Sequence, residues 1–495
     1  MSEAEQGNLS VEMHIEGAEV IGKKLDKMLD NFQFFGIGCI LYGIFFTGCL
    51  YYGFHGISLP VLSAVTMGML LWVFRYLGIQ AKRSIWFYFG AWEILSISNC
   101  LTGNRTIIFF NTCGMVLLFL SFLFTHFCDT SGWGFGKYLW EMFLVPFISL
   151  GYLGYPFKAL ERYFDKKEKG TSATAKYIWL GILIAIPLLL IIVGLLVSAD
   201  AVFRNLFVEV FSDIHFPKHP FYLLMLLTTG ILGSYALLAY FADGRIEDSV
   251  EEKGKWEPVV GITFLSIITV IYLIFSVIQI SYLFLGSFQL PEGYTYAQYA
   301  REGFFQLLFV CLINLVIILI CISHFKENIA LKVILTIFSG CTVIMIASSA
   351  MRMILYIESY QLTFLRILVL WALAVISILL IGCMITIYKS RFPLFQYAMI
   401  VVTVFYIIFS LAKPDYLIAK YNLTYEKEKV DLVYLASLSS DAVPAMEEAG
   451  VLKDAYVGNW HLKKIRIDCE EMGVLDFNFS YNRCEEIMNK RIPMN

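Results

Sequence analysis

Charged residues are scarce in this sequence. Asp, Glu, Lys and Arg make up 16% of the 495 residues, whereas hydrophobic residues make up 59% and aromatic residues 16%. A soluble protein of this length needs far more polar surface to cover its core. The scarcity of charge therefore excludes an ordinary soluble domain. It predicts an all-α helical bundle that crosses a membrane several times.

The sequence also lacks the signatures of the common metal, cofactor and nucleotide sites. It has no CxxC pair, no HExxH, no Walker A loop and no GxGxxG after a strand. Its formal net charge of −3 gives no basic excess for nucleic acid. Asp213, His215 and His219 are close in sequence, but Pro217 keeps the two histidines from stacking one helical turn apart. We expect no metal, no cofactor and no nucleic acid.

Apolar runs of roughly 20 residues predict about eleven spans. The N-terminal segment is acidic and polar, so we do not expect a signal peptide, and the first span should target the chain. Three parts follow: a cytoplasmic segment 1–32, a transmembrane helical domain 33–412 and a helical tail 413–495. The predicted spans are 33–54, 57–78, 84–101, 106–127, 176–198, 220–241, 258–285, 304–323, 329–350, 364–388 and 394–412.

Lysine and arginine are unevenly divided between the predicted loops. Cytoplasmic loops normally carry the excess, and a cytoplasmic N-terminus gives them the larger set. An odd number of spans then places the tail outside. The inner set is Lys23, Lys24, Lys27, Arg75, Lys82, Arg83, the cations of 158–170, Arg245, Lys253, Lys255, Lys326, Lys389 and Arg391. The outer loops contain Arg105, Arg204, Lys218, Arg301, Arg352 and Arg366.

One apolar stretch tests this topology. "YLWEMFLVPFISLGYLGYPF" (138–157) is apolar enough to be a twelfth span, but crossing would put the densest lysine cluster outside. Glu141 and Pro146 also disfavour a lipid-facing helix. We interpret residues 136–160 as an interfacial or re-entrant segment on the cytoplasmic side, with crossing as the alternative.

The tail is polar and holds short helical patterns. "DLVYLASLSSDAVPAMEEAG" has apolar residues at helical spacing, with Asp441 as the expected N-cap and Gly450 as a stop. We expect the tail to form a helical cap on the outer ends of the spans. If it is exported, Cys469 and Cys484 could form a disulfide, and a reduced pair is equally allowed.

Charged residues gather at the predicted outer ends of the spans. Asp200 and Arg204 follow the fifth span, Arg301 and Glu302 open the eighth, and the tail begins with Lys413, Asp415 and Lys420. Arg352, Glu358 and Arg366 occupy the connection between the ninth and tenth spans. Charges near a bilayer are costly unless paired or hydrated, so a shared polar layer is expected.

Two explanations of this layer remain open. The charges can be interhelical salt bridges that fix the bundle and the tail, or a polar cavity for an anionic or sugar-bearing group. Glu93 and Asn99, in the short third span, face Asn111 and Thr112 across the "TGNR" turn. Glu93 is either functional or a protonated glutamate hydrogen-bonded to a neighbouring helix.

Several of these stretches together resemble a bacterial membrane family. "SADAVFRNLF" (198–207), "YAREGFFQLLFV" (299–310), "RMILYIESYQLTFLRIL" (352–368), "IAKYN" (418–422) and "LASLSSDAVPAM" (435–446) carry the resemblance. The family is domain of unknown function 4173, with its sister family 4153. The resemblance covers the chain from about the fifth span to the tail and implies a multi-pass protein of the bacterial cytoplasmic membrane. It implies no activity.

Three classes of function fit these observations. The preferred one is a non-enzymatic envelope, sensor or binding protein whose outer layer binds membrane lipid headgroups, an envelope protein or a lipid-linked ligand. An enzyme acting on a lipid-linked substrate would need a carboxylate base beside arginines, as Glu302 or Asp200 could supply. A transporter would need polar residues near mid-membrane on several helices and some broken helices. Only Glu93, Asn99, Asn111, Gln279 and Asn314 qualify, so this class is weaker.

Overall fold

The computed structural model describes most of the predicted spans and the tail. The described residues are 23–51, 53–130, 133–167, 181, 192–193, 196, 199–200, 202–203, 220–244, 246, 256–281, 303–425, 430–453, 457–458 and 474–491. The predicted fifth span, 176–198, lies largely outside them, and so do Arg204, Arg301, Glu302 and Cys469.

Helices make up the fold in the described part of the chain, which contains no strand, so the all-α prediction is confirmed there. The helices between residues 32 and 411 come first in the chain, and the short tail helices follow. The first group is α2 (Phe32–Leu50), α3 (Ser58–Leu77), α4 (Ile85–Leu101), α5 (Arg105–Phe127), α6 (Phe135–Ile148), α7 (Tyr155–Lys167), α10 (Pro220–Thr228) and α11 (Ser234–Asp243). The second is α12 (Pro258–Gln279), α14 (Phe304–His324), α15 (Ile329–Tyr360), α16 (Phe364–Tyr388) and α17 (Leu394–Leu411). The tail contains α18 (Pro414–Tyr425), α19 (Leu432–Ser437), α20 (Val443–Glu448) and α22 (Phe479–Arg491).

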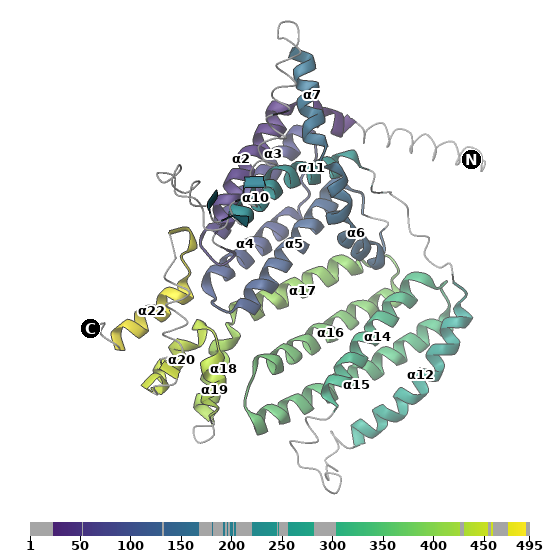
Figure 1. Cartoon of the computed structure of the whole chain (residues 1–495). Coiled ribbons are helices and arrows are strands. Elements are labelled where there is room, and N and C mark those ends of the chain that lie inside the picture. The colour runs from purple at the N-terminus through teal and green to yellow at the C-terminus, as the bar shows by residue number, and fades with distance from the viewer. Residues whose placement is uncertain are drawn as a thin grey trace, which may run out of the picture.

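The long helices form two bundles. The N-terminal bundle contains α2 to α5 with α10 and α11, and the C-terminal bundle contains α12, α14, α15 and α16. Helix α17 runs between them, packed on α4 and on α16 (Figure 1). Each bundle has its own apolar core, and the tail has a third around Ile418, Val443 and Met446.

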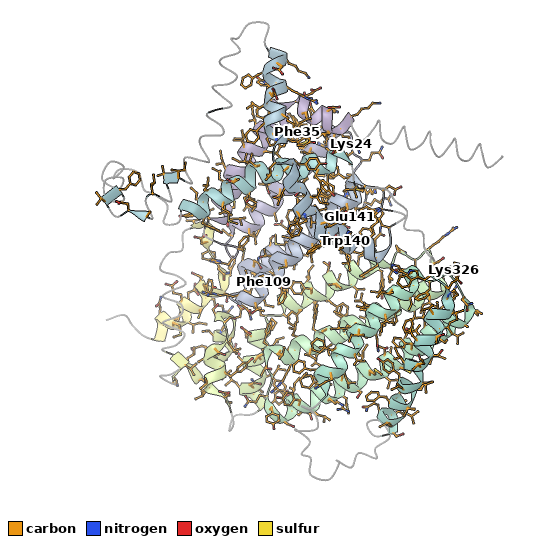
Figure 2. The ribbon with its side chains drawn as sticks, turned by 45° about the vertical axis from the view of Figure 1, so that its right-hand side comes forward. Lys24, Phe35, Phe109, Trp140, Glu141 and Lys326 are labelled. Carbon is orange, nitrogen blue, oxygen red and sulfur yellow. The ribbon has the colours of Figure 1, made fainter. Side chains whose placement is uncertain are left out.

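Apolar side chains cover the outside of the bundles as well as the inside. Phe35 is buried at 1% exposure, whereas Phe109 and Trp140 are 62% and 60% exposed (Figure 2). So much exposed apolar surface is unfavourable in water but favourable in contact with lipid chains. Among the described residues, ten helices are long and apolar enough to cross a membrane. The chain is therefore a multi-pass membrane protein.

The bundles have two distinct ends. We call the end where α18 to α22 lie the tail end, and it includes the α4–α5 turn and the α15–α16 turn (Figure 1). We call the opposite end the basic end, because its loops carry Lys82, Lys326 and Arg391. The predicted orientation makes the basic end cytoplasmic.

The ten candidate helices differ in part from the predicted spans. Helix α4 has 17 residues, which is short for a span, yet it packs between α3 and α5 and runs the length of the bundle. The continuous segment Phe135–Lys166 counts as a candidate span by length and composition alone. Its contacts indicate that it does not cross from one end of the bundles to the other.

Both ends of this segment lie at the basic end. Tyr138 of α6 stacks on Phe395, at the start of α17, with ring centroids 3.8 Å apart. Further along, the Tyr152 hydroxyl donates to Asp243 at the end of α11, at 2.6 Å. Arg162 of α7 then pairs with Asp26 at 2.8 Å, ahead of α2. The segment thus returns to the end at which it starts, and its position in a membrane interface stays a prediction.

A glycine contact lets α2 approach the α10–α11 helix closely. A Cβ on Gly43 would lie 2.7 Å from the Ile231 nitrogen, and one on Gly230 would lie 2.8 Å from the Gly43 Cα. The facing helix contains a π-helical turn, Thr229–Gly233, at this point. Small residues commonly allow such close backbone packing between membrane helices.

Candidate functional site

The tail is attached to the N-terminal bundle through a buried carboxylate. Asp441 is 4% exposed and accepts hydrogen bonds from the Thr102 hydroxyl, from the Gly103 N–H at 3.2 Å and from the Ser480 hydroxyl. The turn approaches the tail closely here, because a Cβ on Gly103 would clash with the Ser440 Oγ unless that side chain moved. The predicted "TGNR" turn is therefore a docking surface for the tail.

Two further side chains complete this attachment, which we call the tail junction (Thr102, Gly103, Asn104, Asp415, Asp441 and Asn478). Asp415, 4% exposed, accepts from the Asn104 amide and from the Ser439 N–H, both at 2.9 Å. Asn478 donates to the carbonyl oxygens of His55, Asn99 and Thr102 at 2.9–3.0 Å. Its Oδ1 accepts from the Ser480 N–H at 2.9 Å.

Electrostatics at the tail junction are set mainly by burial. Burial raises the pKa of Asp441, while hydrogen bonds from Ser480 and Thr102 and the charge of Lys413 act in the opposite direction. Since the carboxylate faces donors from the turn and from the tail, it holds two distant segments together. This is a structural role, with no reacting group beside it among the described residues.

A polar chain continues from the tail junction into the N-terminal bundle. Asn111 donates to the Asn99 Oδ1 at 2.7 Å and accepts from the Ser410 hydroxyl at 2.9 Å, and Ser410 also contacts Ser98 at 2.6 Å. Asn99 and Asn111 therefore meet across the hairpin. Thr112 instead donates to the Ile108 carbonyl of its own helix at 2.8 Å.

Glu93 lies on α4, half-buried, and accepts a hydrogen bond from the Ser63 hydroxyl of α3. Ser63 also contacts Ser96 at 3.2 Å. The glutamate is thus bonded to a neighbouring helix, as the structural explanation requires. This geometry alone does not assign it a function.

At the tail end of the C-terminal bundle lies a second polar group, which we call the arginine layer (Gln279, Gly303, Arg352, Tyr356 and Arg366). Arg352 is 8% exposed and donates through Nη2 to the Gln279 Oε1 at 3.4 Å. Gly303 has a φ of 103°, and a Cβ there would lie 3.1 Å from the Arg352 Nη1. The start of α14, next to Arg301 and Glu302 in sequence, therefore passes close to this guanidinium.

Arg366 contacts the end of α15. Its Nη1 donates to the Tyr360 carbonyl at 2.6 Å and to the Gln361 carbonyl, and its guanidinium lies 4.1 Å above the Tyr356 ring. Arginines commonly satisfy the last carbonyls of a helix in this way. Arg366 thus caps α15 rather than pairing with a described carboxylate, and Glu358 is exposed in the last turn of that helix.

The tail also holds the turn between α15 and α16. Asn422 of α18 accepts from the Leu362 N–H at 2.8 Å and donates to the Leu362 carbonyl at 3.0 Å. The Tyr434 hydroxyl accepts from the Phe364 N–H at 3.0 Å. The tail therefore contacts both bundles, and it contacts the C-terminal one at the turn next to Arg366 of the arginine layer.

The other predicted layer residues are not brought together in the described part. Asp200 is exposed and accepts from the Phe203 N–H at 2.7 Å, a local contact. The pairing of Arg301 with Glu302 and that of Cys469 with Cys484 lie outside the described residues. Within those residues, no group of three or more His, Cys, Asp or Glu side chains could hold a metal ion.

The sequence-based expectation for Asp441 was wrong in its local detail. Ala442 precedes α20 as its N-cap, and Asp431, not Asp441, caps a tail helix by accepting from the Tyr434 N–H at 3.0 Å. The sequence analysis did not single out the junction residue Asn478. The one sequence signal for the tail junction was Asp441, a charged residue in a stretch of otherwise small or apolar residues, 435–446, which also carries the family resemblance.

The comparisons with known proteins give one family. A family model described as a domain of unknown function, DUF4153, matches residues 89–449. The match begins within α4 and ends just after α20, so it includes the α4–α5 turn, the arginine layer and Asp441. It extends further toward the N-terminus than the stretches that carry the resemblance. No curated protein and no solved structure matches the chain significantly.

Proposed function

We propose that this chain, which belongs to the DUF4153 family, is a non-enzymatic binding protein that recognises an anionic headgroup at its tail end. In the predicted orientation this end faces outward from a bacterial cytoplasmic membrane. Binding of this group changes how firmly the tail is attached to the bundles, and the tail thereby signals that the site is occupied. The anionic group belongs to a membrane lipid or to a lipid-linked envelope component.

One relationship carries this proposal. Arg366, in the first turn of α16, donates to the carbonyls of Tyr360 and Gln361 beside the α15–α16 turn. Asn422 and Tyr434 of the tail hold the same turn. A ligand that moves the arginine layer therefore acts directly on the tail. The tail is also attached to Thr102 and Gly103 of the other bundle. Binding at one bundle can thus be passed to the second through the tail.

The chemistry of the arginine layer fits an anionic oxygen ligand. A guanidinium presents a planar fork that matches phosphate or carboxylate in a bidentate way. Arg352 is held by α15 at the end of the bundle, with the neutral Gln279 and the main chain of Gly303 beside it. Gly303 leaves room for a close approach that a side chain would block.

Native mass spectrometry in mild detergent tests this proposal. We expect an anionic lipid adduct in the wild type that is lost in Arg352→Gln at equal thermal stability. Arg105→Gln is the matched control, because Arg105 is an exposed arginine at the same end, on α5. If Arg352→Gln does not fold, the same adduct is measured in Arg301→Ala and in Glu302→Gln, and its loss in either folded variant is the expected result. A wild type without an adduct, or an adduct that survives in folded Arg352→Gln, contradicts the proposal.

Transport is the second candidate, because buried polar groups cross the C-terminal bundle. The Tyr272 hydroxyl donates to Asn314 at 3.0 Å, and Asn314 donates to Thr342 at 3.0 Å. Nearer the tail end, the Ser348 hydroxyl donates to Gln279 at 2.6 Å. A solute flux in proteoliposomes that Asn314→Leu abolishes would favour this candidate. No contact among the described residues favours the enzymatic alternative.

A further inference from the structure

A groove of about 430 Å³ lies at the basic end, between the two bundles. Its walls come from the segment before α6, the ends of α14 and α16, and the first turn of α17. Helix α17 separates the bundles, so the groove lies where they meet (Figure 1). The lining residues used below are Trp133, Tyr138, Arg391, Phe395 and Gln396.

Two features of the groove favour an anion. Arg391, in the turn between α16 and α17, is exposed and has no carboxylate partner among the described residues. No side chain caps α17. The Leu394 N–H donates to the Phe392 carbonyl at 2.8 Å, so Phe395 and Gln396 supply the remaining N–H groups of the first turn. The N–H groups at the start of a helix point outward and carry a partial positive charge, which attracts phosphate.

A buried donor provides a third, independent observation. Trp133 lines the groove and is 8% exposed, and its Nε1–H has no acceptor in the described part of the chain. The Nζ of Lys137, itself 9% exposed, lies 4.8 Å from the Trp133 ring. Buried indole N–H groups usually have an acceptor, so this one is consistent with a ligand oxygen nearby.

The neighbouring surface extends the positive charge. A second groove of about 290 Å³ shares Thr386 and Ser390 with the first and adds Lys326 and Lys332. Those two lysines pair with Glu257 and Glu327. The net attraction for an anion therefore centres on Arg391, in the first groove.

The surroundings indicate a lipid. Trp140 and Phe143 of α6 are 60% and 62% exposed beside this end of the protein, as Figure 2 shows for Trp140. Exposed tryptophans such as Trp140 are enriched at the level of the headgroups in a bilayer. A groove between helices with basic residues at this level matches the headgroup of an anionic lipid.

We propose that an anionic membrane phospholipid binds this groove, with its phosphate at the first turn of α17 and beside Arg391. The lipid occupies the junction of the two bundles, at the end opposite the tail. This site is separate from the arginine layer, and it does not depend on the function proposed for that layer.

Retention of defined lipids tests the site. Wild type and variants are purified with phosphatidylglycerol or with phosphatidylcholine and compared by native mass spectrometry. We expect Arg391→Gln to retain about fivefold less phosphatidylglycerol, the effect of one cation near a bilayer surface. Lys389→Gln is the matched control, since it removes a cation two residues away that does not line the groove. Trp133→Phe, which removes the N–H donor together with part of the ring, should also reduce retention.

Each other result has a defined meaning. Equal losses in Arg391→Gln and Lys389→Gln would reduce the effect to general surface charge and overturn the site. Equal retention of phosphatidylcholine, or full displacement of the lipid by inorganic phosphate, would overturn an anionic lipid as the occupant. Because both proposed sites take an anionic lipid, Arg391→Gln is also measured in the Arg352→Gln background. A fivefold loss that persists there belongs to the groove, whereas no further loss would overturn the groove and leave only the tail-end site.

Discussion

Asn422 and Leu362 are joined by two hydrogen bonds, because the Asn422 amide accepts from the Leu362 N–H at 2.8 Å and donates to its carbonyl at 3.0 Å. The two residues lie on different sides of α16 and α17 in the sequence, 60 positions apart. An asparagine side chain that satisfies both main-chain groups of one residue fixes the α15–α16 turn against the tail.

Asn422→Ala should loosen the tail from the C-terminal bundle. The substitution leaves the N–H and carbonyl of Leu362 without these partners, at a cost of about 1–3 kcal/mol. Hydrogen exchange of α18 reports the free energy of local opening. Asn482→Ala is the control, because Asn482 makes an exposed contact with Glu486 on α22. Equal exchange in the two variants would contradict this account of the turn.

Asp441→Ala should detach the tail from the N-terminal bundle. The Thr102 hydroxyl, the Gly103 N–H and the Ser480 hydroxyl all lose their acceptor. Buried donors without a partner destabilise by about 1–3 kcal/mol. Limited proteolysis after α17 should become faster than in the wild type, while the spans stay folded. Unchanged proteolysis would show that the carboxylate does not hold the tail.

The pH dependence of this attachment has a defined sign. Burial raises the pKa of Asp441 above its ordinary 3.8, so the docked tail holds the proton more tightly than the detached tail does. Attachment is therefore strongest below 3.8 and weakens as the pH rises through the raised value. Asp441→Asn carries no charge and should remove this dependence. Exchange rates corrected for intrinsic chemistry measure it, and a tail that docks more tightly with rising pH would contradict the prediction.

The contact between α2 and the π-helical turn should not tolerate a side chain. Gly43→Ala places a Cβ 2.7 Å from the Ile231 nitrogen, so the helices must separate. Such overpacking typically costs about 1–3 kcal/mol. Gly48→Ala on the same helix meets no atom within 4 Å and should be neutral or stabilising. Thermal unfolding in detergent compares them, and equal melting temperatures would contradict the close contact.

Much of the fold could be predicted because it depends on local sequence. Apolar runs of span length predict helices wherever they occur, and "TGNR" predicts a turn because Asn104 caps α5 by accepting from the Thr106 and Ile107 N–H groups. The Asn99–Asn111 contact follows from the same hairpin. Short-range patterns were sufficient for these features.

The tail contacts could not be predicted in the same way. Asp441 and Thr102 are 339 positions apart, and nothing in either local pattern selects the other as a partner. Charge suggested that Arg366 belongs either to an ion pair or to a ligand site, and neither suggestion identifies the main-chain carbonyls at the end of α15 that it contacts. Side-chain partners across a membrane bundle depend on the order of the helices around it, which loop lengths do not specify.

The most direct test of the proposed function is hydrogen exchange of the tail in lipid nanodiscs. Wild type, Arg352→Gln and the control Arg105→Gln are compared in anionic and in zwitterionic lipid. The account predicts that anionic lipid changes the protection of α18 and α19 in the wild type and in Arg105→Gln, but not in Arg352→Gln. The same tail protection in both lipids for the wild type would contradict a tail that reports binding at the arginine layer.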